Sequence, residues 1–175
     1  MRAGCILVYF LITDALVRIQ REHNVSSTHQ RYKGFKPFKM DPKFRVSIPT
    51  SWRPEAGASL FLLFSKEHEM PVVKVLSQEA YNEKVELIQG SDMTPKAKNQ
   101  KLGKLAMLSR EATLNEQGKL LVPKDLSEKA GIEAEGEVVL AGRGIHFEIW
   151  SKTNFDTTLN IETSQDDDDD ELGIF

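Results

Sequence analysis

The chain has 175 residues, 40% apolar and 28% charged, with a formal net charge of −3, as expected of an ordinary globular protein. Its single cysteine, Cys5, excludes an internal disulfide and a cysteine-rich metal site, and a reducing cytoplasm is the natural compartment. Six acidic groups lie between Asp166 and Glu171, so the rest of the chain carries a net charge of +3. This mildly basic body is compatible with a nucleic-acid partner.

The first 31 residues are predicted to be an N-terminal extension. The apolar run Gly4–Ile12 is too short to span a bilayer. It has the length of a signal-peptide core, but Asp14 follows it and no small-x-small cleavage site is present. We favour a start codon assigned too far upstream, with an additional buried segment and a true signal as alternatives.

The region 34–76 is predicted to form strands. Phe35–Lys39 alternates aromatic and basic residues, which favours an edge strand in which Pro37 is tolerated. We expect its apolar residues to face inward and its lysines outward, with stacking on bases as the alternative. The runs Ser59–Phe64 and Val72–Val75 predict two further strands, joined by a turn around Glu69–Pro71.

Two helices are predicted between Gln78 and Arg110, separated by a break at Gly90–Asp92. Thr94 suits the N-cap of the second helix, with Pro95 in its first turn. That helix is basic, which is typical of a solvated face and leaves DNA contact as the alternative; its lysines are Lys96, Lys98, Lys101 and Lys104.

The C-terminal region is predicted to contain a short helix, a hairpin, a closing helix and a disordered acidic tail beyond Glu162. Gly131 is expected to end the short helix, and His146 to be structural because no other ligand lies at zinc-site spacing. The elements are expected at Lys124–Ala130, at Glu137–Gly142 with His146–Trp150, and at Ser151–Leu159.

A ten-residue pattern occurs twice, at Met40–Pro49 and Leu114–Pro123. Each copy reads apolar, Asx, two variable residues, a variable residue or Gly, a cation, three mostly apolar residues and Pro. The two copies are 74 residues apart, which suits two halves of one pseudo-symmetric domain. Each copy predicts a strand, a polar turn and a second strand, with the proline ending the strand and helices beginning at Trp52-Arg53 and at Leu126.

Arg45 and Lys119 occupy equivalent positions in the two copies. A repeated cation on a pseudo-two-fold scaffold suits a repeated anionic ligand, of which the DNA backbone is the commonest. The alternative is that each cation pairs with its neighbouring Asx or with a carboxylate on a helix.

From about Tyr32 to Phe155, the sequence resembles the MraZ family, bacterial regulators of the AbrB/SpoVT swapped-hairpin superfamily. The final Phe147-Glu148-Ile149-Trp150 is the most specific piece. The other matching segments are Tyr32–Phe35, Asp41-x-Lys43-x-Arg45, Ile48-Pro49, Ala130–Ile132, Val138–Gly142 and Gly144–His146.

The resemblance implies a mainly β fold with short helices (α+β), a swapped-hairpin β-barrel formed by two pseudo-symmetric βαβ-like halves. We expect the halves at 32–80 and 109–155. A helical linker at 81–108 would join the halves and help subunits meet, and residues 156–175 would form a closing segment and the acidic tail.

The resemblance also implies a sequence-specific transcriptional regulator, cytoplasmic and nucleoid-associated, that assembles into a ring-like homo-oligomer. Its partner would be double-stranded DNA carrying direct repeats upstream of the division and cell-wall gene cluster. Arg45, Lys43 and Lys119 are the expected DNA-binding residues. Asp41, Asn115 and Gly118 are expected to shape the turns and orient those cations.

The chain departs from the family pattern in both turns. Phe44 stands where the family usually has Gly, so the first turn is expected to differ in shape. The second copy has Asn115 for Asp and Lys119 for Arg, which places sequence readout mainly in the first half.

An alternative function is an oligomeric interaction protein that has lost DNA readout, favoured by Phe44 on an exposed turn and by the apolar N-terminus. The sequence contains no phosphate loop, nucleophile elbow or metalloprotease motif, so no enzyme is predicted. We also expect no metal, cofactor, small-molecule substrate or membrane partner.

Overall fold

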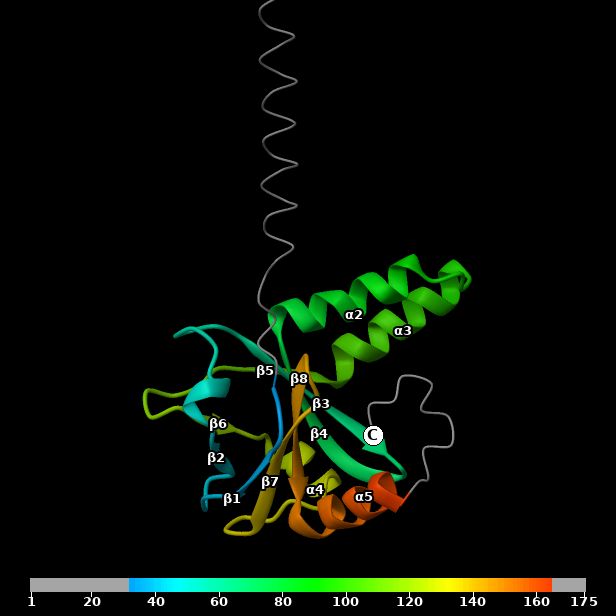
Figure 1. The fold of residues 1–175 in the computed structure, drawn as a ribbon. Helices are drawn as coiled ribbons and strands as arrows, with labels where there is room; N and C mark the ends of the chain where they lie inside the picture. Colours follow the sequence, from blue (N-terminus) through cyan, green and yellow to red (C-terminus); the bar gives the residue numbers. More distant parts are fainter. Residues whose placement is uncertain (1–31, 165–175) are drawn as a thin grey trace, which may run out of the picture.

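The computed structural model describes residues 32–164 (Figure 1). The predictions for the N-terminal extension and for the acidic tail from residue 165 onward lie outside these residues. Within residues 32–164, no helix is long and apolar enough to cross a membrane.

The described chain forms a six-stranded antiparallel sheet and a separate two-stranded antiparallel ribbon. In spatial order, the sheet contains β1 (Phe35–Lys39), β7 (Glu137–Gly142), β8 (His146–Ser151), β4 (Met70–Ser77), β3 (Leu60–Glu67) and β5 (Ser109–Ala112). The ribbon consists of β2 (Arg45–Ser47) and β6 (Lys119–Leu121). The expectation of a mainly β, α+β fold is confirmed.

The helices are short and lie around the strands. They are η1 (Thr50–Trp52), α2 (Gln78–Gly90), α3 (Pro95–Leu108), α4 (Lys124–Lys129) and α5 (Lys152–Ser164). The predicted cap of α3 is confirmed, since Thr94 Oγ1 accepts a hydrogen bond of 3.4 Å from the Ala97 amide. α5 extends five residues beyond Leu159, where it was predicted to end.

The prediction of a helix that begins at Trp52-Arg53 is wrong. The chain makes a single 3-10 turn over Thr50–Trp52, and Arg53 is extended with φ −73° and ψ 130°. Pro54 follows Arg53 and disfavours the helical conformation of the residue before it. Arg53 therefore lies in an extended loop after β2 and not in a helix.

Strand pairing repeats between the two halves of the chain. β1 pairs with β7 as β5 pairs with β3, and the β3–β4 hairpin corresponds to the β7–β8 hairpin. β4 pairs with β8, and β2 pairs with β6, so each of these pairs joins the two halves. In the ribbon, Val46 lies opposite Leu120, its equivalent in the second copy of the repeat.

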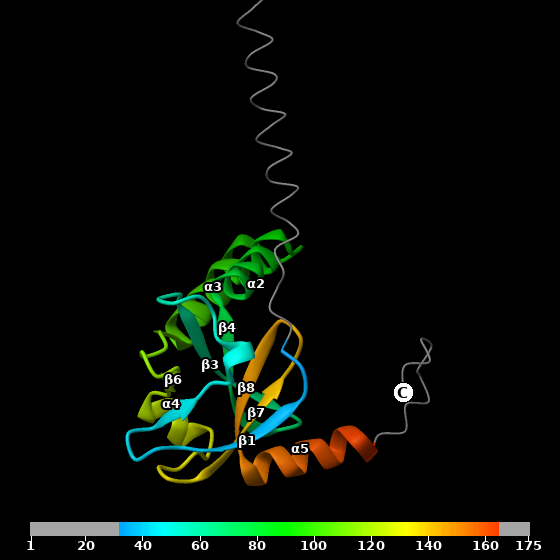
Figure 2. The same cartoon turned by 60° about the vertical axis from the view of Figure 1, so that its left-hand side comes forward.

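Two hydrophobic clusters cover the two faces of the sheet. The main cluster includes the inward-facing residues of the ribbon, Val46 and Leu120, both fully buried. The smaller cluster packs α5 against β4, β7 and β8 through Val72, Val139, Ala141, Trp150 and Phe155. Figures 1 and 2 place α5 at one end of the molecule and the α2–α3 hairpin at the other.

The edge strand β1 departs from its predicted orientation. Phe35 is 55% exposed, and its ring centroid lies 5.0 Å from that of Phe155 on α5. On the opposite face, Phe38 packs on the main cluster and Lys36 Nζ lies 5.9 Å from the Trp52 ring centroid. The expectation of inward apolar residues is therefore wrong for Phe35, because different elements cover the two faces of this strand.

A buried carboxylate links β8 to α5. Glu148 is 1% exposed, and its Oε2 accepts hydrogen bonds from Arg143 Nε (2.9 Å) and Trp150 Nε1 (3.0 Å). Burial alone would raise the pKa of Glu148, but the neighbouring His146 and Arg143 outweigh it and lower that pKa. Arg143 also binds both carboxylate oxygens of Glu162 on α5. His146 thus lies in a structural ion network, consistent with its predicted role.

The alternation of the ribbon gives a direct test of its packing. Leu120 is fully buried, whereas the next residue, Leu121, is 52% exposed. We expect Leu120→Ala to lower the free energy of unfolding by about 2–5 kcal/mol through the cavity it leaves. Leu121→Ala should change it by less than about 0.5 kcal/mol. Urea denaturation measures both, and equal losses would contradict the observed register.

Candidate nucleic-acid interface

The two turns of the repeat have the same hydrogen bonds. In the first, Asp41 Oδ1 accepts from the amides of Lys43 and Arg45, both at 2.9 Å. In the second, Asn115 Oδ1 accepts from the amides of Gln117 (3.0 Å) and Lys119 (2.8 Å). An Asx oxygen that binds the amides two and four residues ahead fixes the backbone of each turn.

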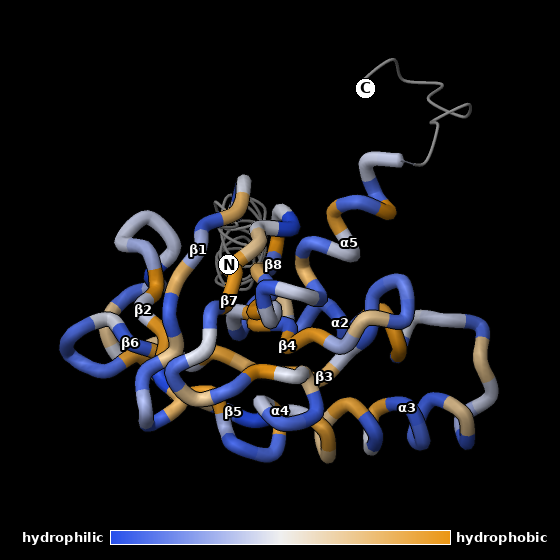
Figure 3. The backbone as a smooth tube through the Cα atoms, turned by 90° about the horizontal axis from the view of Figure 1, so that it is seen from below, coloured by the Kyte–Doolittle hydropathy of each residue, from blue (hydrophilic) through white to orange (hydrophobic). Residues whose placement is uncertain are grey.

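Backbone hydrogen bonds hold the two turns beside each other. The Phe44 carbonyl accepts from the Val122 amide at 2.9 Å, and the Gly118 carbonyl accepts from the Ile48 amide at 3.0 Å. These are equivalent bonds, exchanged between the two copies of the repeat. The β2–β6 ribbon therefore presents both turns on one rigid unit, visible at the edge of the molecule in Figure 1. Figure 3 shows that the loop beside β6 is mainly hydrophilic.

Phe44 takes the same left-handed conformation as Gly118. Their φ angles are +54° and +73°, so the expectation of a differently shaped first turn is wrong. A non-glycine residue pays about 1–2 kcal/mol for this conformation. Phe44 is half-buried and packs against the main cluster, which offsets part of that strain. It is not an exposed partner-binding residue, and one argument for the interaction-protein alternative is lost.

The Arg53 side chain lies against Gly118, so a larger residue there would have to displace it. A Cβ at this position would lie 2.2 Å from Arg53 Cζ. Arg53 is held there by a hydrogen bond of 2.8 Å from its Nε to the Ile48 carbonyl. Sequence reasoning did not identify Arg53 as part of this surface. The only signal was Pro54, which disfavours a helical conformation at Arg53.

Both repeat cations converge on one carboxylate. Asp41 Oδ2 accepts from Arg45 Nε at 2.8 Å and lies 2.7 Å from Arg45 Nη2. Lys119 Nζ, from the other turn, lies 3.7 Å from the same oxygen. The Arg45 and Lys119 side chains keep 33% and 30% of their surface exposed. The alternative prediction, that each cation pairs with its own Asx, therefore describes Arg45 but not Lys119.

The hydrogen bond from the Arg45 side chain is the main cause that lowers the pKa of Asp41, to about 2. The amides of Arg45 and Lys43 also bind the ionised carboxylate and act in the same direction. Asp41 therefore stays ionised at neutral pH and fixes the direction of the Arg45 guanidinium. Lys43, in the middle of the turn, is exposed.

The outer face of the ribbon carries four side chains, since strand residues alternate between faces. Val46 and Leu120 point into the core, so their neighbours point outward: Arg45 and Ser47 on β2, and Lys119 and Leu121 on β6. This face can bind phosphate oxygens and donate to base edges. Within residues 32–164, no group of three His, Cys, Asp or Glu side chains is placed to hold a metal ion.

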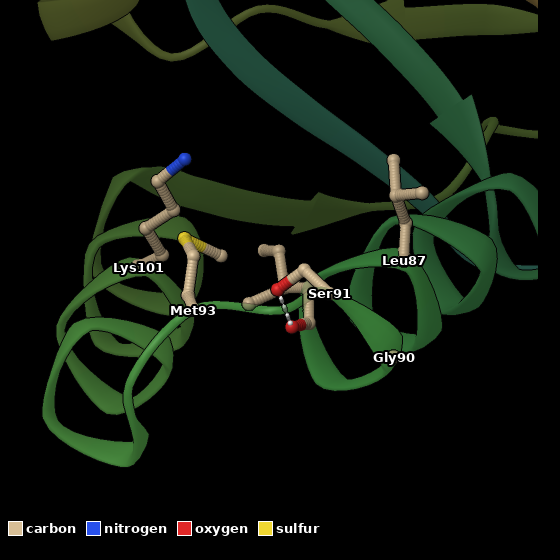
Figure 4. A pocket seen from close by; sticks show the side chains of 6 residues that line it. Leu87, Gly90, Ser91, Met93 and Lys101 are labelled. Atoms are coloured by element: carbon tan, nitrogen blue, oxygen red, sulfur yellow. Dashed lines mark hydrogen bonds between the residues drawn. The ribbon is translucent and has the colours of Figure 1, made fainter.

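A second surface feature is a shallow hollow of about 390 Å³ between α2 and α3. Figure 4 shows Leu87, Met93 and Lys101 along it, with the Ser91 hydroxyl bonded at 2.7 Å to the Ile88 carbonyl. Leu87 is 75% exposed and Met107 on α3 is 69% exposed, and α3 buries none of its residues. The hairpin thus presents an apolar surface rather than a converging set of polar groups.

The basic helix α3 differs from the ribbon in how its lysines are held. Lys98 Nζ donates to the Gln89 carbonyl at 2.7 Å, which ties α3 to the end of α2. Lys96, Lys101 and Lys104 are exposed. Among the described residues, none of these three lysines forms an ion pair like that of Arg45 with Asp41, and their arrangement fits a solvated face.

The chain is similar to proteins of one named family. A family model described as "MraZ protein, putative antitoxin-like" matches residues 105–172, which include the second turn. The chain is 28% identical over 118 residues to a transcriptional regulator MraZ of Mycoplasmopsis pulmonis, covering 67% of this chain and 77% of that protein.

Two further relatives carry the same name. The transcriptional regulator MraZ of Desulforapulum autotrophicum is 29% identical over 126 residues, 70% of this chain and 81% of that protein. That of Desulfosudis oleivorans is 26% identical over 141 residues, 79% of this chain and 92% of that protein. The chain is thus similar to MraZ regulators over most of its length. Its two Asx turns have the same hydrogen bonds but differ in charge.

The role of the Asp41 charge is open to a pH test. Because its pKa in the folded protein, about 2, lies below the usual value for Asp, ionised Asp41 stabilises the fold above about pH 4. This contribution is lost as the pH falls toward 2. We expect Asp41→Asn to keep the turn, since Asn115 forms the same turn in the second copy. The variant should lose the pH-dependent contribution of ionised Asp41 to the free energy of unfolding.

Thermal unfolding of both proteins from pH 7 to pH 2 measures the effect. The difference between their midpoints should stay constant down to about pH 4 and shrink at lower pH. Asp41→Ala, which also removes the acceptor of two backbone amides, should be less stable than Asp41→Asn at every pH. A difference that does not change with pH would contradict the assigned ion pair.

Proposed function

We propose that this chain is a sequence-specific DNA-binding transcriptional regulator that acts through the outer face of the β2–β6 ribbon. Its similarity to the MraZ family and the names of its relatives support transcription regulation. The observation that carries the DNA-binding part is the convergence of Arg45 and Lys119 on Asp41, which places two oriented cations on one exposed face. Its ligand is double-stranded DNA with direct repeats in a promoter region, upstream of the division and cell-wall gene cluster.

The major groove admits a two-stranded β-ribbon, the kind of element that β2 and β6 form. Arg45 reads guanine, because a guanidinium can donate to O6 and N7 together, whereas Lys119 supplies a point charge for phosphate. Lys43 adds a second phosphate contact from the first turn. Asp41 orients Arg45, and Asn115 and Gly118 shape the second turn so that Lys119 reaches the same face.

One ribbon makes few contacts, so tight binding requires several subunits. We propose a ring-like homo-oligomer in which successive ribbons bind successive repeats, since linked sites raise the effective concentration of each contact. The apolar α2–α3 surface, with Leu87 and Met107 exposed, supports this hairpin as the contact between copies. Such a regulator acts in the cytoplasm, at the nucleoid.

We propose that the two halves of the chain together form one domain. The paired β2 and β6 and the matching hairpins support a swapped-hairpin β-barrel with halves at 32–80 and 109–155 and a helical linker at 81–108. Each half then supplies one turn, one ribbon strand and one hairpin. The ribbon forms only when the two halves are combined, so the DNA-binding face depends on both.

A second candidate function is an oligomeric interaction protein without DNA readout. The observation that favours it is the apolar α2–α3 surface, which lies on the helical hairpin rather than on the ribbon. Apolar binding at this surface should depend little on salt. DNA binding should weaken steeply, by about 0.9 log units per phosphate contact for each log unit of salt.

The test is a salt titration of binding to the DNA upstream of the chain's own gene. Arg45→Ala should weaken binding roughly 5- to 150-fold for each ribbon bound, because a bidentate contact to guanine is worth about 1–3 kcal/mol. Lys119→Ala should lower the salt slope by about 0.9 for each ribbon bound, without changing sequence preference.

Lys66→Ala, an exposed lysine on β3 outside the ribbon and the α2–α3 hairpin, is the matched control and should bind as the unaltered protein does. The proposal fails if the unaltered protein assembles but does not bind DNA. It also fails if Lys66→Ala weakens binding as much as Arg45→Ala.

A further inference from the structure

The outer face of the ribbon contains one apolar side chain among its polar ones. Leu121 is 52% exposed and lies directly opposite Arg45 in the strand register. Its equivalent in the first copy is Ser47, which lies opposite Lys119. The two cations therefore have different neighbours: arginine is paired with leucine, and lysine with serine.

The fold does not require an apolar residue at this position. The residues on either side of Leu121, Leu120 and Val122, are both fully buried in the main cluster and supply the core contacts of this segment. Leu121 belongs to neither hydrophobic cluster of the described residues. The presence of Ser47 at the equivalent position of β2 shows that the ribbon accepts a polar side chain there.

The chemistry of the major groove gives Leu121 a partner. Thymine is the base that presents a methyl group there, and apolar side chains read it by contact, while arginine reads guanine. Directly opposite residues in an antiparallel pair have Cβ atoms about 5 Å apart, and stacked bases are about 3.4 Å apart along a strand. Arg45 and Leu121 can thus reach neighbouring bases together.

We propose that Leu121 is a specificity-determining residue that contacts the C5 methyl group of a thymine next to the guanine read by Arg45. This inference rests on the proposed DNA-binding function and adds a base to it. The Lys119–Ser47 side of the face has no equivalent apolar contact. The ribbon therefore distinguishes one direction along the DNA from the other, which suits direct repeats better than a palindrome.

The experiment begins with duplexes selected from a random pool by the full chain, followed by replacement of each thymine with deoxyuridine. This change removes one methyl group and leaves base pairing intact. At one thymine it should weaken binding about 4-fold, the effect of about 0.8 kcal/mol per buried methylene. The same replacement should have no effect on Leu121→Ser, and a reduced effect on Leu121→Val.

Ile145→Ser is the matched control, because Ile145 is also an exposed aliphatic residue but lies in the turn between β7 and β8, outside the ribbon and the α2–α3 hairpin. It should keep the full preference for thymine over deoxyuridine. Sedimentation of each variant is measured alongside, since Leu121 at a contact between subunits would change the size of the assembly.

The inference is overturned if Leu121→Ser keeps the thymine preference, if no thymine matters, or if Leu121→Ser changes the assembly. In the first two cases the proposed DNA binding by the ribbon still stands. A changed assembly would instead place the outer face of the ribbon at a contact between subunits and would contradict the proposed function as well. If no duplex is selected at all, the proposed function itself fails.

Discussion

The Asp41 carboxylate is the group on which the candidate site depends. One of its oxygens fixes the backbone of the first turn, and the other lies between Arg45 from β2 and Lys119 from β6. Two cations close together on a small ribbon would repel each other, and an ionised carboxylate between them offsets that repulsion. The hydrogen bond from Arg45 keeps Asp41 ionised, so the charge that holds the cations is maintained by one of them.

The two halves of the chain share their backbone geometry but not their chemistry. Phe44 and Gly118 have the same left-handed conformation, and equivalent amides bind Asp41 and Asn115. The side chains then differ at each outward position of the ribbon, with arginine and serine on β2 and lysine and leucine on β6. A symmetric scaffold thereby presents an asymmetric face, which can read a base sequence with a direction.

Much of the fold could be predicted because it is encoded locally. The strands β3 and β4, the cap at Thr94 and the two Asx turns all follow from short-range rules of alternation, capping and turn chemistry. The helix at Trp52-Arg53 was predicted wrongly, because the restriction that Pro54 places on Arg53 was not applied. The orientation of Phe35 was also predicted wrongly, because it depends on α5, more than a hundred residues away.

The arrangement of the site depended on contacts that no local pattern reveals. The repeat identified Arg45 and Lys119, but their shared carboxylate follows from the pairing of β2 with β6, residues 74 apart in the chain. The position of Arg53 against Gly118 and the burial of Phe44 also depend on tertiary contacts. The sequence predicted the residues of the candidate site better than their partners.

The measurement that tests the central claim most directly is lysine acetylation of the assembled protein with and without its selected duplex, followed by mass spectrometry. It compares the two basic surfaces within one sample. We predict that DNA protects Lys43 and Lys119 of the paired turns and leaves the reactivity of Lys101 and Lys104 of α3 unchanged. Protection of the α3 lysines, with Lys43 and Lys119 unchanged, would contradict the ribbon as the DNA-binding face.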